Sequence, residues 1–198
     1  MFSSLLLAAA TAQGTPAAYP AQDVLSVFEH SCTPIADFDK ATALAEKAGW
    51  KTFDAVPDSK VGQLIAFGRR AMERMGTDME VIEGGTYRRE VSGRDLYMVI
   101  SGVRGAGFES RGCRIYDFDA AAPIGKAELT EWAGREPSSD PSENSPILSY
   151  GWEPGLTPDH TDMEVIFAEQ DADLPGPLAE LPLSGLVFSA SIVELTDQ

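Results

Sequence analysis

The segment from Asp159 to Glu164, DHTDME, holds the densest group of side chains that could do chemistry. If it is extended, His160, Asp162 and Glu164 point to one side, because side chains alternate along a strand. Imidazole and carboxylate groups can hold a divalent metal or act as acid and base. This interpretation predicts a metal-dependent hydrolase. The competing interpretation is a capped loop that runs into a strand with a polar outer face.

A repeated hexamer, TDMEVI, overlaps this segment and occupies residues 77–82 and 161–166. The earlier copy contains the two acids without the histidine, which favours sheet-face residues over a metal site. We interpret the two copies as equivalent strands of one sheet. Internal duplication is a further hypothesis, because no alignment extends beyond the hexamer.

A second group of candidate residues is basic. Six arginines fall within 27 positions: Arg88, Arg89, Arg94, Arg104, Arg111 and Arg114. Guanidinium groups bind carboxylates and phosphates, which makes Arg88, Arg104, Arg111 and Arg114 candidates for an anion site. The alternative is ion pairing with the acidic C-terminal half across a sheet. We favour pairing, because it needs no ligand and explains the charge distribution.

The formal net charge of −16 is unevenly distributed. Up to Ile115, 13 basic residues oppose 14 acidic ones, whereas from Tyr116 onward only Lys126 and Arg135 oppose 17 acids. The acidic half would repel nucleic acid and an anionic membrane, so we expect neither as a partner. We favour a solvated acidic face as the explanation; the alternative is a cationic protein or small-ligand partner that uses this half.

The first residues predict export. Leu5 to Ala10 is apolar, and cleavage after Ala12 would remove residues 1–12 as a signal peptide and leave 13–198 as one domain. No Lys or Arg precedes the apolar run, so a buried N-terminal helix is the alternative. No segment reaches the ~20 apolar residues of a membrane span. We therefore expect a periplasmic or secreted protein.

Export decides how the two cysteines are interpreted. In an oxidising compartment Cys32 and Cys113 are predicted to form a disulfide, with two buried thiols as the alternative. A C-x-x-C pair is missing, and two cysteines and two histidines make a zinc site a poor fit. We expect no cofactor. Because no complete catalytic motif occurs, the favoured function is non-catalytic binding.

The periodicity of apolar residues predicts helices first and strands afterwards. The expected helices are 20–32, 37–48, 59–75 and a short one at 124–133. The expected strands are 79–83, 86–91, 95–103, 113–118, 147–152, 163–168 and 186–195. Gly84-Gly85 is predicted to be a hairpin turn. This order predicts an α+β fold, with N-terminal helices packed on one face of an antiparallel sheet of about seven strands.

The spacing of a few residues also forms a pattern. Phe28 and Cys32 give F-x-x-x-C, Ala45 to Trp50 gives A-x-x-x-G-W, and Cys113 follows in a strand. This layout resembles small uncharacterised exported bacterial proteins over about the first half of the chain. The resemblance implies bacterial export and a structural role for these residues, and it implies no activity.

Overall fold

The computed structural model describes residues 18–75, 79–105, 107–142, 145–170, 172–174, 176, 179 and 181–196. The expected signal peptide, residues 1–12, lies outside them. The helices are α1 (Ala21–Cys32), α2 (Phe38–Lys47), α3 (Lys60–Met75) and α4 (Lys126–Ala133). The strands are β1 (Lys51–Thr52), β2 (Glu80–Val91), β3 (Arg94–Gly105), β4 (Phe108–Asp117), β5 (Ile147–Trp152), β6 (Asp162–Ala168) and β7 (Gly185–Leu195). None of the helices in these ranges is long and apolar enough to cross a membrane.

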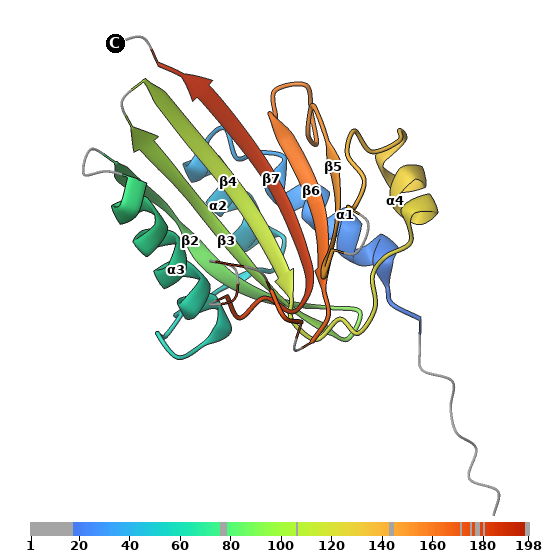
Figure 1. Cartoon of the computed structure of the whole chain (residues 1–198). Helices are drawn as coiled ribbons and strands as arrows, with labels where there is room; N and C mark the ends of the chain where they lie inside the picture. The colour runs from blue at the N-terminus through green and yellow to red at the C-terminus, as the bar shows by residue number, and fades with distance from the viewer. Residues whose placement is uncertain are drawn as a thin grey trace, which may run out of the picture.

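The strands form one antiparallel sheet in the order β1-β2-β3-β4-β7-β6-β5 (Figure 1). The expected α+β fold with a seven-stranded antiparallel sheet is therefore confirmed. The predicted hairpin at Gly84-Gly85 is wrong, because β2 continues through these glycines with a bulge between Glu83 and Gly85. A side chain at Gly84 would meet Ile100 at 2.5 Å, so the glycine permits close contact with β3. The short strand β1 restores the number of strands to seven.

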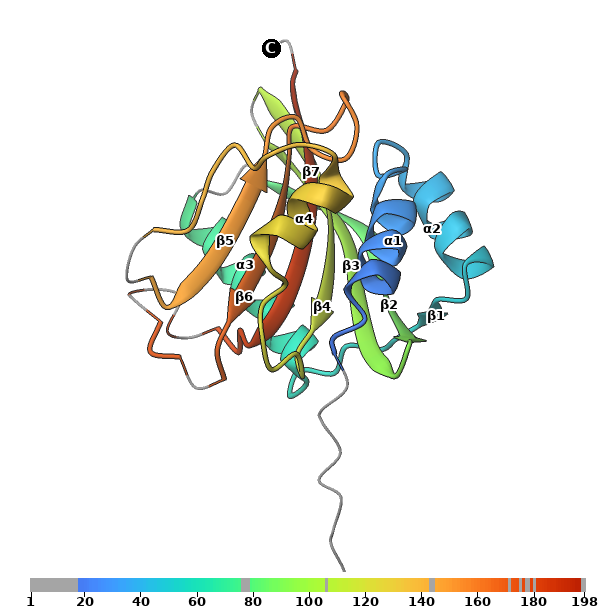
Figure 2. The same ribbon diagram turned by 90° about the vertical axis from the view of Figure 1, so that its right-hand side faces the viewer.

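Helices cover both faces of the sheet (Figure 2). We call the side that carries α1, α2 and α4 the α1 face, and the opposite side the α3 face. On β3, Leu96 and Met98 join the core of the α1 face, whereas Val99 packs with Val61 of α3. The placement of α3 differs from the expectation that all N-terminal helices share one face. It follows from β3 and β4, which are apolar on both sides and need a second covering layer.

A disulfide joins α1 to the central strand of the sheet. Cys32 ends α1 and Cys113 lies in β4, with their Cα atoms 5.4 Å apart and both side chains fully buried. Phe28, one helical turn before Cys32, is also fully buried, so the apolar stripe of α1 directs Cys32 at the sheet. The predicted Cys32–Cys113 disulfide is confirmed.

Candidate functional site

The structure separates the predicted metal ligands. β6 begins only at Asp162, and the chain turns just before it, so strand alternation does not extend to His160. His160 is 2% exposed and lies on the α1 face, where its Nε2 is 3.3 Å from the carbonyl oxygen of Cys32. Asp162 and Glu164 lie on the α3 face. Within the described ranges, no three His, Cys, Asp or Glu residues are arranged to hold a metal ion.

Both ring nitrogens of His160 are engaged in holding a turn. A carbonyl oxygen can only accept, so in the neutral imidazole Nε2 donates to Cys32 and Nδ1 accepts from the Thr157 hydroxyl at 2.8 Å. The backbone of Gly155 also donates to the carbonyl of His160. His160 therefore attaches the 153–161 turn to the end of α1, next to the disulfide.

The two carboxylates of the predicted cluster have different surroundings. Asp162 accepts a hydrogen bond from the Ser191 hydroxyl at 2.7 Å. Burial raises the pKa of Glu164, the neighbouring charge of Asp162 raises it further, and Arg114 lowers it. Glu164 is therefore a half-buried acid on the α3 face, on the opposite side of the sheet from His160.

The repeated hexamer does not place equivalent residues. Thr77 and Asp78 of the first copy lie outside the described residues. Glu80 of that copy pairs with Arg104 on the α1 face of β2, whereas Glu164 of the second copy lies on the α3 face of β6. Both strands are second from an edge of the sheet. The two copies thus lie on strands that have similar positions in the sheet, but their glutamates, Glu80 and Glu164, lie on opposite faces.

Three of the four candidate arginines are paired with acids in the sheet. Arg88 binds Asp95 at 2.7 Å. Arg104 and Arg111 both bind Glu109, at 2.8 and 2.5 Å, and together they lower its pKa, Arg104 having the larger effect. These three arginines form ion pairs, as the pairing interpretation expects. Their partners come mainly from the same hairpins; the predicted pairing with the acidic C-terminal half is seen for Arg111, which lies 3.4 Å from Glu194 of β7.

Arg114 differs from the other three arginines. It is exposed on the α3 face of β4, and it makes no ion pair with any residue that the structure describes. It lies in register with Ser189 of β7, which is in register with Glu164 of β6. Arg114 and Glu164 are thus two strands apart, close enough for the arginine to affect the pKa of the acid.

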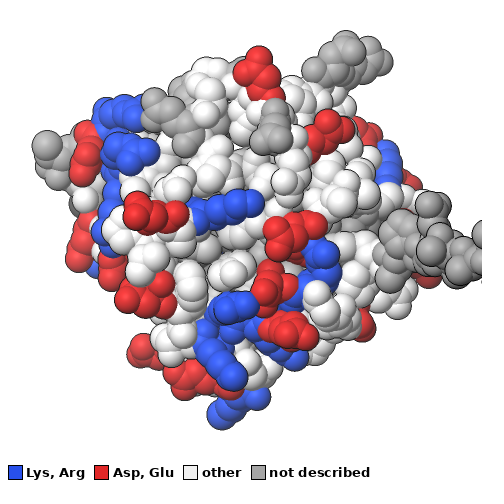
Figure 3. Space-filling view, turned by 90° about the horizontal axis from the view of Figure 1, so that it is seen from below, with Lys and Arg blue, Asp and Glu red and all other residues white. Residues whose placement is uncertain are grey.

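Four exposed acidic side chains on α4 and on the turn before β6 form no ion pair with any residue that the structure describes. Glu128 and Glu131 are exposed on α4, and Glu153 and Asp159 are exposed on the turn that precedes β6. Arg135 connects the two segments, since its guanidinium donates to the carbonyls of residues 153–155. None of these four acids pairs with a basic group in the described part of the chain. The face seen in Figure 3, by contrast, carries interspersed acidic and basic side chains.

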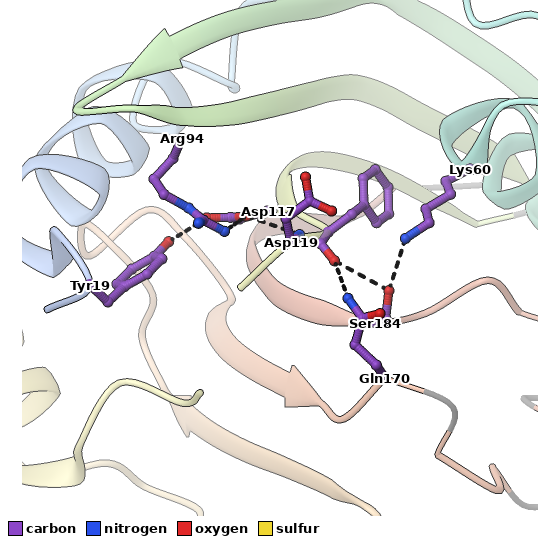
Figure 4. A network of polar contacts seen from close by, with 8 residues as sticks. Tyr19, Lys60, Arg94, Asp117, Asp119, Gln170 and Ser184 are labelled. Atoms are coloured by element: carbon purple, nitrogen blue, oxygen red, sulfur yellow. Dashed lines mark hydrogen bonds and ion pairs between the residues drawn. The ribbon is translucent and has the colours of Figure 1, made fainter. Parts of the chain in front are cut away.

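A buried polar network connects Tyr19, near the start of the described chain, with Arg94 of β3 and Asp117 of β4 (Figure 4). We did not predict these contacts from the sequence. Arg94 donates to both carboxylate oxygens of Asp117, at 2.8 and 2.6 Å, and the Tyr19 hydroxyl donates to the same carboxylate at 3.0 Å. The backbone N–H of Asp119 is a further donor. Burial, followed by the charge of Asp117, raises the pKa of Tyr19. Because donors surround Asp117, it anchors the N-terminal segment rather than taking part in proton transfer.

Sequence reasoning had one available signal for this network. Asp117 is the single acid in the apolar run CRIYDF, and its side chain is 1% exposed. A charge in a strand covered on both faces needs a partner. The sequence did not indicate which residues are the partners of Asp117, since Tyr19 is 98 residues away along the chain.

A cavity of about 250 Å³ lies at the other end of the network in Figure 4. Lys60 of α3 donates to the Ser184 hydroxyl at 3.2 Å, and its ammonium lies 5.2 Å from the ring centre of Phe118. Ser184 and the amide of Gln170 both donate to the carbonyl of Phe118. A lysine that activates a serine must be desolvated, and Lys60 is exposed, so this pair does not form a nucleophilic site.

Comparison with protein-family models, with curated proteins and with solved structures finds no match.

Proposed function

We propose that this is an exported, non-catalytic protein that binds a basic segment of a partner protein. Binding uses the acidic surface, defined as Glu128, Glu131, Glu153 and Asp159. The observation that carries the proposal is that the acids around α4 form no ion pairs in the described part of the chain, whereas most acids near the arginines of the N-terminal half are paired. Arg88, Arg104 and Arg111 pair with acids of the β2–β4 hairpins, so these three arginines do not compensate the acids around α4.

The acidic surface has the properties of an electrostatic docking site. Its acids repel one another while they remain unpaired, and a Lys- or Arg-rich segment removes that repulsion on binding. Arg135 holds the two segments together through backbone carbonyls, so the carboxylates are partly preorganised. Exposed ion pairs contribute little each, and binding is therefore weak to moderate, fast and sensitive to salt.

Export is supported by the disulfide. Disulfides persist in oxidising compartments and are rare in the cytosol of most organisms. The Cys32–Cys113 bond connects residues 81 positions apart and is fully buried, so it is an integral part of the fold. Together with the apolar run before Ala12, it supports a periplasmic or secreted location for residues 13–198.

The test is binding of a fluorescent nona-lysine peptide, followed by anisotropy at low and at physiological salt. The variant E128Q/E131Q/E153Q/D159N neutralises the acidic surface. The matched control D39N/E46Q/D54N/E73Q removes the same number of exposed acids from segments where they alternate with Lys and Arg. We expect about tenfold weaker binding for the first variant and little change for the control.

Two results would contradict the proposal. If both variants weaken binding equally, the peptide responds to net charge and no localised surface exists. If wild-type affinity does not fall with salt, the interaction is not electrostatic. Far-ultraviolet circular dichroism of both variants establishes that the fold is intact.

A further inference from the structure

The cavity beside α3 combines a polar end and an apolar wall. Its lining includes Lys60, Gln170 and Ser184 at the polar end. The remaining lining residues are Ala172, Leu174, Ala179, Leu181, Pro182 and Leu183. Figure 4 shows Lys60 reaching from α3 toward Ser184 and Gln170. A ligand that fills this space therefore needs one polar group and an aliphatic part.

The polar end offers hydrogen-bond donors. The Lys60 ammonium has three protons and uses one on Ser184. The Gln170 amide has two N–H groups and uses one on the Phe118 carbonyl, which already accepts from Ser184. Two ammonium protons and one amide proton remain. Three donors that include a full positive charge match the two oxygens of a carboxylate.

The helix that carries Lys60 adds to this preference. Lys60 is the first residue of α3, a helix of 16 residues, and the positive end of the helix dipole lies there. Ser59 caps the helix by accepting from the backbone of Gly62, so the helix end itself is satisfied. The ammonium of Lys60 is thus the group that faces the ligand, and the dipole strengthens its attraction for an anion.

The volume sets the size of the aliphatic part. Each non-hydrogen group occupies roughly 30 Å³, taking the share of a water molecule as a guide, so a cavity of about 250 Å³ holds about eight of them. A carboxylate with a chain of about six carbons has this size. Leu174 is 5% exposed and lies on the wall, whereas Lys60 is exposed. The chain therefore points inward and the carboxylate stays near the surface.

We propose that this cavity binds a short aliphatic carboxylate, with the carboxylate at Lys60 and Gln170 and the chain against the leucines. The site is separate from the acidic surface around α4 and does not depend on it. Binding adds no covalent step. The ligand completes hydrogen bonds that the polar end of the cavity leaves open and removes apolar surface from water.

The experiment is titration of the full chain with sodium hexanoate, followed by calorimetry and by chemical shifts of the backbone amides. Butanoate and decanoate measure the chain length, and hexylammonium measures the charge. We expect saturable binding of hexanoate, weaker binding of butanoate, no gain for decanoate, and no binding of hexylammonium. The shifted amides should be those of Lys60, Gln170 and residues 181–184.

Variants locate the carboxylate. Lys60→Gln keeps a polar side chain, one bond shorter, and removes the charge, and we expect about tenfold weaker hexanoate binding. Lys47→Gln on α2 is the matched control and should bind as the wild type does. The proposal is overturned if hexanoate causes no saturable change, if hexylammonium binds equally well, or if both lysine variants bind hexanoate equally. Circular dichroism of both variants distinguishes lost binding from lost folding.

Discussion

Replacing Arg94 by Ala tests the buried network that anchors the N-terminal segment. The change removes two charge-assisted hydrogen bonds, at 2.8 and 2.6 Å, from a carboxylate whose side chain is 1% exposed. Tyr19 and the Asp119 N–H remain as donors, but the positive charge opposite Asp117 is lost. Breaking a buried pair from one side costs about 3–5 kcal/mol. Arg94 is 24% exposed, so water partly replaces it, and we expect about 3 kcal/mol.

Arg88→Ala on the same hairpin is a matched control. Arg88 binds Asp95 with similar geometry, but both side chains are well exposed, at 50% and 40%. Exposed ion pairs contribute little, so this variant should unfold almost as the wild type does. Urea unfolding at pH 7 measures both variants, and the slope of free energy against urea shows whether the comparison is valid. Equal midpoints for the two variants would refute the structural role of the Arg94–Asp117 pair.

Three further predictions concern the disulfide, the hydroxyl of Tyr19 and two glycines with positive φ. Breaking the Cys32–Cys113 link in the variant C32A/C113A should lower the free energy of unfolding by about 4 kcal/mol, since the bond closes a loop of 81 residues, and an unchanged urea midpoint would contradict this. The pKa of Tyr19 is raised in the folded state, so the contribution of Tyr19 to folding stability is fully present below the ordinary tyrosine pKa of about 10 and is lost as pH rises above it. In Tyr19→Phe the free energy of unfolding should therefore fall less steeply at alkaline pH. Identical pH profiles of stability for the variant and the wild type would refute this. Gly185→Ala should lower the free energy of unfolding by about 3 kcal/mol, because φ is +78° and a Cβ would overlap the Asp117 carbonyl. Gly134→Ala should lower it by about 1 kcal/mol, because φ is +66° but the space around the Cβ is free. Equal losses in thermal unfolding would show that the overlap at Gly185 is relieved by movement of its neighbours.

Local patterns predicted most elements of this fold. The Asp37 side chain accepts from the backbone of Lys40 and begins α2, at the start of the helix expected over 37–48. Ser92 and Gly93 have positive φ and make the tight turn between β2 and β3. The disulfide was predictable because the expectation of export favoured an oxidised pair, and Phe28 and Cys32 lie one helical turn apart on the same buried stripe.

Long-range pairing decided the features that the sequence did not predict. Two glycines in sequence suit a turn or a bulge, and the register of β2 against β3 selects the bulge. The apolar stripe of α3 shows that the helix packs on something, but the path of the chain past β2 decides which face receives it. Strand alternation placed His160 beside Asp162 and Glu164 only on the assumption that β6 begins before residue 160. Tyr19 and Asp117 carried no local signal of their contact.

Export with a closed disulfide is tested most directly by the intact mass of protein taken from the cells that make it. The sample is treated with a thiol-alkylating reagent without prior reduction, so that only free cysteines gain mass. The mass should correspond to a chain that begins at Gln13 and carries no alkyl group. A chain that keeps Met1 would contradict the proposed export. A chain with both Cys32 and Cys113 alkylated would contradict the disulfide that supports this location.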